Sequence, residues 1–143
     1  WEEKIRFKTV ADVTGGHNGI ETRVGIAYTE GVANRGMSLE RFVEITSSNA
    51  ARIFGMYPKK GAIAPGSNAD ITIIDPTINR KLTLADLHLE DYSIWEGFDI
   101  AGWPTTTILR GEIAVQNNQI QTTPGHGQFL KRSISSHVTS TPI

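Results

Sequence analysis

Four histidines are the residues of this sequence best able to bind a metal ion: His17, His88, His126 and His137. No two of them have the i, i+2 or i, i+4 spacing that would direct two imidazoles toward one ion. The sequence has no cysteine, which excludes a thiolate zinc site, a disulfide and a cysteine nucleophile. No serine lies in a G-x-S-x-G elbow. The residues therefore predict neither a catalytic residue nor a metal site formed by this segment alone.

A glycine-rich loop at residues 14–19, TGGHNG, is the other feature that could do chemistry. Glycine and asparagine tolerate positive φ, so the backbone can turn sharply here and leave its amide and carbonyl groups accessible. Such a loop can bind a planar amide or imide ring through main-chain hydrogen bonds. The alternative that the residues leave open is a tight turn without a ligand.

The charges of the chain are nearly balanced, with 14 Lys and Arg against 15 Asp and Glu. That balance gives no general attraction to nucleic acid or to an anionic membrane. No apolar run approaches the roughly 20 residues that span a bilayer. We therefore expect no nucleic-acid partner and no membrane partner. Because the sequence opens at Trp1 and not at Met, we also expect that a further segment precedes it in the parent protein.

The residues that must position the loop are predicted to be helical. Residues 21–34 have a weak helical pattern, with Val24, Tyr28 and Val32 on one face and a stop at Gly36. A second helix follows from the N-cap Ser38, with Leu39, Phe42, Val43 and Thr46 on one face. The polar run at residues 46–49 is expected to interrupt it and to cap a third helix that buries Ala50, Ile53 and Phe54 and ends at Gly55.

After Pro58 the pattern changes to that of strands. A β-branched run is expected to end at Pro76, and residues 77–104 read as a long ordered connection that packs its aromatic side chains on a sheet. Short turns then separate the strands of a meander. Residues 5–10 are expected to be a short strand or an extended segment, and residues 128–143 an extended tail. The predicted strands are residues 70–75, 105–109, 112–115 and 119–121.

Six stretches follow one another along the chain as recognisable motifs: residues 14–23, 46–61, 63–71, 95–98, 110–111 and 124–130. The first resembles P-x-G-x-x-G-[IV]-E-x-R, and the second resembles T-S-x-N-A-A-[KR]-I-[FM]-G-[LM]-Y-P-[RK]-K-G. The others resemble I-A-x-G-S-D-A-D-[IL], F-E-G-[MW], S-R-G-[KE] and P-G-x-G-[RQ]-[FY]-[IL]. In this order, the motifs resemble those of the dihydropyrimidinase/D-hydantoinase family of the amidohydrolase superfamily. The Y-P-[RK]-K-G element favours this branch over dihydroorotase or allantoinase.

The resemblance implies an α/β fold: the last barrel helices of a TIM-barrel amidohydrolase, followed by strands of a small β-sandwich domain. It implies a parent enzyme that opens hydantoin or dihydropyrimidine rings to N-carbamoyl amino acids. Two zinc ions, bridged by a carboxylated lysine and hydroxide, would polarise the ring carbonyl and supply the nucleophile. The family's metal ligands and catalytic aspartate lie upstream of the matched part, so we expect no cofactor and no activity in this segment alone.

The same resemblance implies a substrate-binding role for the loop. The family binds the amide edge of its substrate through backbone atoms at the position of Gly15, so Thr14, Gly16 and His17 are implied beside it. Many members have Asn or Glu where Gly15 stands, and Thr14 replaces the usual proline, so the ring specificity stays open. The implied partners are a small cyclic amide or imide and further copies of the chain in a homodimer or homotetramer, and the implied location is the cytoplasm.

The expected organisation is the end of the barrel domain at residues 1–56, sandwich strands at 57–123 and a tail at 124–143. The layers that complete this arrangement belong to the parent, so we expect the chain alone to expose apolar surface and to be poorly stable or to self-associate. Two alternatives remain open. One is a non-enzymatic dihydropyrimidinase-like protein that acts in assembly, and the other is an independent small β-rich binding module.

Overall fold

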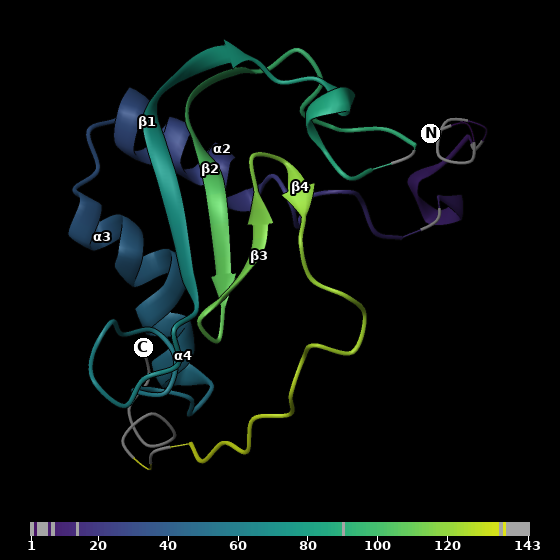
Figure 1. Ribbon diagram of the computed structural model, residues 1–143. Coiled ribbons are helices and arrows are strands. Elements are labelled where there is room, and N and C mark those ends of the chain that lie inside the picture. Colours follow the sequence, from purple (N-terminus) through teal and green to yellow (C-terminus); the bar gives the residue numbers. More distant parts are fainter. Residues whose placement is uncertain are drawn as a thin grey trace.

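The computed structural model describes residues 2, 6, 8–13, 15–89, 91–134 and 136 of the chain. Helical segments come first, and a four-stranded antiparallel sheet follows them with helices packed against one of its faces (Figure 1). The expected mixed α/β class is confirmed. None of the helices in the described ranges is both long and apolar enough to span a bilayer.

The first helical run joins α2 (Arg23–Ala27) to the π-helical segment η2 (Tyr28–Asn34) without a break. Gly36, with φ +68°, ends it. The helix predicted over residues 21–34 is thus confirmed. The three side chains that the pattern places on one face, Val24, Tyr28 and Val32, are half-buried, and the buried positions lie beside them and include glycines and threonines. The buried residues are Thr22, Gly25, Ile26, Thr29 and Gly31.

Glycine occupies this face because the sheet comes too close for a side chain. A Cβ placed on Gly25 would lie 2.3 Å from ring carbons of Trp103, well inside ordinary van der Waals contact. Thr29 adds hydrogen bonds to the same strand, since its hydroxyl donates to the Ala101 carbonyl at 3.3 Å and lies 3.1 Å from the Ala101 amide. The first helical run is therefore fixed directly on strand β2 (Asp99–Leu109).

The second helical run joins α3 (Leu39–Val43), η3 (Glu44–Ser48) and α4 (Asn49–Ile53). The Ser38 side chain caps it by accepting from the Arg41 amide at 3.2 Å, and Gly55 ends it with φ +67°. Both predicted boundaries are confirmed.

The predicted interruption at residues 46–49 is wrong. The Thr46 hydroxyl donates to the Phe42 carbonyl at 2.6 Å. This hydrogen bond to the preceding turn lets the polar run remain helical.

The second run buries few of its apolar side chains. Phe42 and Ala51 are buried, and the edge of Phe42 meets the Tyr28 ring with 5.6 Å between centroids. The other members of the two predicted faces stay exposed or half-buried, and the Arg132 guanidinium lies over the exposed Phe54 ring, 5.7 Å from its centroid. We name the exposed set the helical apolar surface: Leu39, Val43, Ile45, Ile53 and Phe54.

The sheet is a meander in the order β1-β2-β3-β4. Arg110 and Gly111, with φ of 52° and 86°, turn between the second and third strands. Asn117 and Asn118, with φ of 48° and 61°, turn between the last two. The predicted strands and turns are therefore confirmed, with two strands longer than expected. The strands are β1 (Ile71–Lys81), β2 (Asp99–Leu109), β3 (Glu112–Gln116) and β4 (Gln119–Ile120).

The prediction that Pro76 ends the first strand is wrong. The register of β1 against β2 shifts between Asp75 and Asn79, and the Asp75 carboxylate accepts from the Thr77 amide at 2.8 Å. This irregularity accommodates the proline, which has no N–H for the ladder, and pairing resumes beyond it. The predicted long connection is shortened at both ends, to residues 82–98.

The core lies where that connection, the first helical run and the long strands meet. Leu82 is fully buried and packs with Ile26, Leu87 and Ile100. Aromatic side chains of the connection pack against this core as predicted, and Trp95 and Phe98 meet edge to face with 5.3 Å between centroids. A short 3₁₀ turn, η4 (Leu84–Asp86), carries a capping box formed by Thr83 and Asp86.

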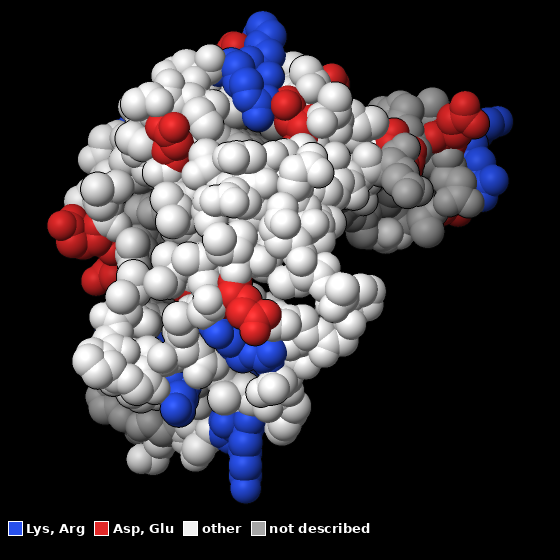
Figure 2. Space-filling view, viewed as in Figure 1, with Lys and Arg blue, Asp and Glu red and all other residues white. Residues whose placement is uncertain are grey.

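The ends of the described chain have little regular structure. Val10–Asp12 form a 3₁₀ turn, η1, rather than the strand that we considered, and Ile5 and Phe7 lie outside the described residues. Residues 128–134 form no helix or strand, and the Ser133 amide donates to the Gly55 carbonyl at 3.2 Å. Figure 2 shows acidic and basic side chains scattered over one face, with a broad uncharged area between them.

Candidate functional site

The glycine-rich loop lies at the surface between η1 and the first helical run. Gly15, Gly16 and His17 are exposed, and Gly16 has φ +83°. A Cβ placed on either of these two glycines would meet no other heavy atom within 4 Å. Thr14, the remaining predicted site residue, lies outside the described residues. We name residues 15–20 the candidate loop. A small ring could approach its backbone in the open space beside Gly15 and Gly16.

The end of the candidate loop is fixed on the first helical run. Thr22 is fully buried, and its hydroxyl donates to the Gly19 carbonyl at 3.3 Å. The Thr22 carbonyl accepts from the Ile26 amide at 2.9 Å. The loop therefore leaves a buried residue of the helix, which limits how far its last residues can move.

A carboxylate–imidazole pair joins the residue after the loop to the connection between the long strands. The Glu21 carboxylate accepts from the His88 amide at 2.9 Å and lies 2.7 Å from the His88 Nδ1. On its other side, His88 Nε2 lies 3.2 Å from the Asn118 carbonyl. Both ring nitrogens thus face acceptor oxygens, and the ring can donate to both only in its doubly protonated form.

A second contact reaches the loop from the same connection. The Asn18 side-chain amide donates to the Tyr92 carbonyl at 3.0 Å. Neither this contact nor the Glu21–His88 pair was predicted. Both join residues about 70 positions apart, and no local pattern could indicate such a pairing.

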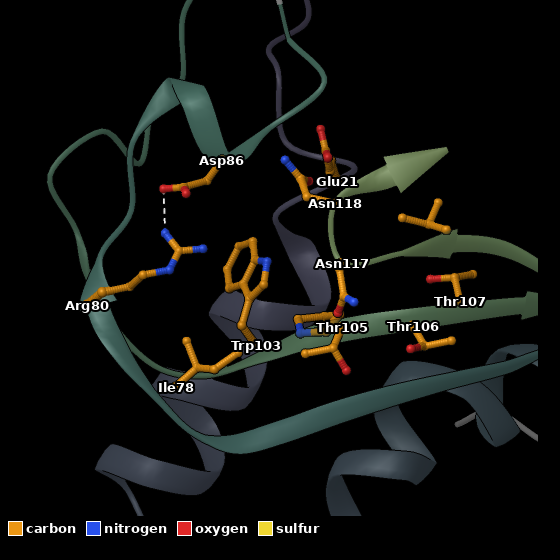
Figure 3. A pocket seen from close by; sticks show the side chains of 12 residues that line it. Glu21, Ile78, Arg80, Asp86, Trp103, Thr105, Thr106, Thr107, Asn117 and Asn118 are labelled. Carbon is orange, nitrogen blue, oxygen red and sulfur yellow. Dashed lines mark ion pairs between the residues drawn. The ribbon is translucent and has the colours of Figure 1, made fainter. Parts of the chain in front are cut away.

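A cavity of about 300 Å³ lies on the sheet beside this pair (Figure 3). Glu21 and Asn118 stand at one end of it, and the Trp103 ring rises from the floor. The Arg80–Asp86 ion pair stands on the opposite side. The walls also include threonine and asparagine side chains of β2 and the last turn.

The Asp86 carboxylate, which lines this cavity, accepts hydrogen bonds from Thr83 and pairs with Arg80. Burial raises its pKa, but hydrogen bonds from the backbone and side chain of Thr83 and the positive charge of Arg80 lower the pKa overall. An ionised carboxylate with three partners is suited to holding structure in place and poorly suited to accepting a proton.

The described histidines do not come together. His17 lies in the loop, His88 pairs with Glu21, and His126 lies 3.6 Å from the Glu112 carboxylate. His137 is outside the described residues. Within the described ranges, no three His, Cys, Asp or Glu side chains gather as a metal ion requires. These residues therefore do not fit a two-zinc centre, and no step through a metal can be derived from them.

A separate network brings several of the family-like stretches together in space. The Asp70 carboxylate accepts from the Arg110 amide at 2.8 Å and pairs with Lys60. The Arg110 guanidinium donates to the His126 carbonyl at 2.5 Å. The contacts join the turn before the first strand, the hairpin and the start of the tail. Their role here is structural, because they lie among turns and hold the backbone of the sheet edge.

Comparison with known proteins identifies the relatives of the chain. A family model described as "Amidohydrolase family" matches residues 3–114. A D-hydantoinase from Geobacillus stearothermophilus is 42% identical over 115 residues, which are 80% of this chain and 24% of the relative. A dihydropyrimidinase from Rattus norvegicus is 41% identical over 121 residues, 84% of this chain and 23% of the relative. The chain thus spans about a quarter of the length of these curated relatives.

Solved structures agree with the sequence comparison. D-hydantoinase from a Bacillus sp. AR9 superposes with a TM-score of 0.82 at 40% identity, covering 87% of this chain and 28% of that one. L-hydantoinase (dihydropyrimidinase) from Arthrobacter aurescens gives a TM-score of 0.79 at 35% identity, covering 86% and 28%. These names give no support to a non-enzymatic assembly protein, and the extended match rules out the independent binding module. The chain belongs to the amidohydrolase family and resembles one portion of its hydantoinases and dihydropyrimidinases.

Proposed function

We propose that this chain is the C-terminal part of a cyclic-amide hydrolase that opens hydantoin or dihydropyrimidine rings to N-carbamoyl amino acids. The observation that carries the proposal is the match, at about 40% identity, to enzymes named hydantoinase and dihydropyrimidinase. Relatives named D-hydantoinase and L-hydantoinase both match the chain, so the proposal leaves the stereochemical preference open.

Within that enzyme, the proposed role of the chain is to supply the candidate loop as part of the substrate site. Backbone groups of Gly15 and Gly16 would contact the amide edge of the ring, with Thr14 and His17 beside them. The exposure of Gly15, Gly16 and His17 and the open space beside the two glycines support this role. Neutral backbone donors and acceptors suit a ring that presents both N–H and C=O groups.

Two zinc ions, bridged by a carboxylated lysine, are proposed for the parent enzyme and would be held by residues outside the described ones. When bound, they would polarise the scissile carbonyl and supply a metal-activated hydroxide. The described residues would bind and orient the ring. A homo-oligomer, either a dimer or a tetramer, is also proposed, and this proposal rests on the family resemblance alone. A cytoplasmic location is consistent with a sequence that has no cysteine.

The proposed organisation of the parent places residues 1–56 at the end of the barrel domain, residues 57–123 in a β-sandwich and residues 124–143 in the tail. The last helix ends at Ile53 and the first strand begins at Ile71, which supports the first boundary. The two parts share one core, in which Ile26 packs with Leu82, so they would be rigidly joined in the parent.

A chimera tests the proposed activity. The matched quarter of the Geobacillus stearothermophilus D-hydantoinase is replaced by the aligned part of this chain, and hydrolysis of hydantoin and dihydrouracil is measured beside the unaltered enzyme. We expect ring opening within about tenfold of that enzyme. A folded, zinc-loaded chimera that opens neither ring would contradict the proposal.

Two glycine variants of the chimera test the backbone role of the loop. Gly15→Ala and Gly16→Ala add the same methyl group into open space, but only Gly16 has a positive φ. A strained φ costs about 1 to 2 kcal/mol for an alanine, so the backbone should shift at Gly16 and not at Gly15. We expect KM to rise at Gly16→Ala and to stay unchanged at Gly15→Ala. Equal KM values in both variants would count against a backbone contact at this turn.

A further inference from the structure

We infer that Glu21 and His88 act as a positioning pair that holds the candidate loop in place for the ring substrate. The inference rests on the proposed function for its substrate, and it adds two residues that touch neither the ring nor a metal. Glu21 directly follows the loop, and its carboxylate is held by both the backbone and the ring of His88. Two contacts with one residue fix the orientation of the Glu21 carboxylate as well as its distance from His88.

The pair is anchored on a rigid part of the molecule. His88 follows Leu87, which is buried in the core beside the fully buried Leu82. The other side of its ring meets the Asn118 carbonyl, in a tight turn held by the sheet. The support for the loop therefore runs from the core through His88 to Glu21.

The pair acts together with two other contacts that hold the loop. Thr22 fixes the Gly19 carbonyl, and Asn18 reaches the Tyr92 carbonyl from the same connection. Ile20 is 90% exposed and contributes no packing. When the position of a backbone edge determines ring binding, small displacements weaken binding. Glu21 and His88 are thus positioning residues, and their loss should act on substrate affinity more than on the chemical step.

Proteolysis of the 143-residue chain tests the positioning without any activity. A protease that cleaves before bulky apolar residues is expected to cut at Gly19–Ile20 in proportion to local opening. Glu21→Ala should raise that rate about tenfold, whereas cutting before Ile63, which is 85% exposed, stays unchanged as an internal standard. Glu112→Ala is the matched control, because it removes a carboxylate facing His126 far from the loop. An unchanged rate at Gly19–Ile20, or an equal rise at Ile63, would overturn the inference.

A double-mutant cycle tests whether the two residues act as one unit. His88→Ala should produce the same rise as Glu21→Ala, and the double variant should exceed either single variant only slightly. Glu21→Gln keeps an acceptor for the His88 amide and should restore most of the protection. Fully additive effects on the cleavage rate would show that the two side chains act independently, and they would overturn the inference that the residues act as a pair.

The same variants in the hydantoinase chimera test the effect on the substrate. We expect KM to rise about tenfold in Glu21→Ala while kcat changes less than about twofold, and Glu112→Ala to change neither. A fall in kcat at constant KM would overturn the positioning role. If the chimera with wild-type residues opens no ring, the proposed function fails, whereas the proteolysis result still decides whether the pair holds the loop.

Discussion

Replacing Gly25 by alanine tests the closest contact between the helices and the sheet. The new Cβ would lie 2.3 Å from two ring carbons of Trp103 and 3.0 Å from a third, whereas carbon atoms in contact normally lie about 3.5 to 4.0 Å apart. The ring must therefore move by about 1 Å. The helix cannot simply retreat, because the Thr29 hydroxyl holds it to Ala101.

Two opposing free energies decide the outcome. Alanine favours a helix over glycine by about 1 kcal/mol, and overpacking a fitted core costs about 1 to 3 kcal/mol. We expect Gly25→Ala to lower the free energy of unfolding by about 1 kcal/mol. Tryptophan fluorescence in urea, at chain concentrations below about 1 μM, should then show a midpoint lower by about 0.5 to 1 M.

Gly31→Ala is the control for this prediction, since it is the same change in the same helical run. Its Cβ would lie 3.1 Å from the Met37 Cε, the end of a flexible side chain that can move aside. We expect this variant to be as stable as the wild type, or more stable by up to about 1 kcal/mol. The double variant with Trp103→Leu should cost less than the sum of its two changes. The reasoning is refuted if Gly25→Ala is as stable as Gly31→Ala.

Three further predictions concern acid stability, the sheet edge and association. Burial raises the pKa of Asp86, but hydrogen bonds from the capping threonine and the charge of Arg80 lower this pKa overall, to below its ordinary value of 3.8. The carboxylate therefore stabilises the fold above the ordinary pKa, and this stability is lost as the pH falls through the lower pKa of the folded state. Asp86→Asn should therefore lose less stability between pH 5 and pH 2 than the wild type in urea titrations. Asp70→Asn leaves Lys60 without its partner and should lower the free energy of unfolding by about 1 to 3 kcal/mol. The isolated chain should self-associate at about 10 μM in sedimentation velocity, and Phe54→Lys should reduce this association.

The parts of the fold that depend on neighbouring residues could be predicted from the sequence. Ser38 caps a helix and Gly55 ends one, because capping geometry is set within a few residues. The turns at residues 110–111 and 117–118 adopt positive φ, as glycine and asparagine allow; Arg110 adopts it as well. The change from a helical to a strand pattern after Pro58 correctly predicted helices before this residue and strands after it.

The parts that depend on tertiary contacts could not be predicted in this way. Pro76 does not end its strand, because the irregular pairing with β2 absorbs it. Helical periodicity placed Val24 and Tyr28 on one face, but it did not indicate that the close approach of Trp103 requires a glycine at position 25. Each of these features depends on a neighbour that lies far away in the sequence.

The candidate site follows the same division. The loop was visible in the sequence because glycine and asparagine mark it, and its exposure agrees with that reading. Its support by Glu21 and His88 was not visible, because 67 residues separate the two. The substrate-binding role of Gly15 remains a prediction that rests on the family resemblance.

The central proposal is that this chain supplies the candidate loop and its supporting scaffold to an amidohydrolase whose metal ligands would lie outside the described residues. The most direct test is the zinc content of the purified 143-residue chain after loosely held metal is removed, measured by elemental analysis beside a dihydrouracil hydrolysis assay. The account predicts far less than one zinc ion per chain and no ring opening. One or two tightly bound zinc ions per chain with measurable ring opening would contradict it.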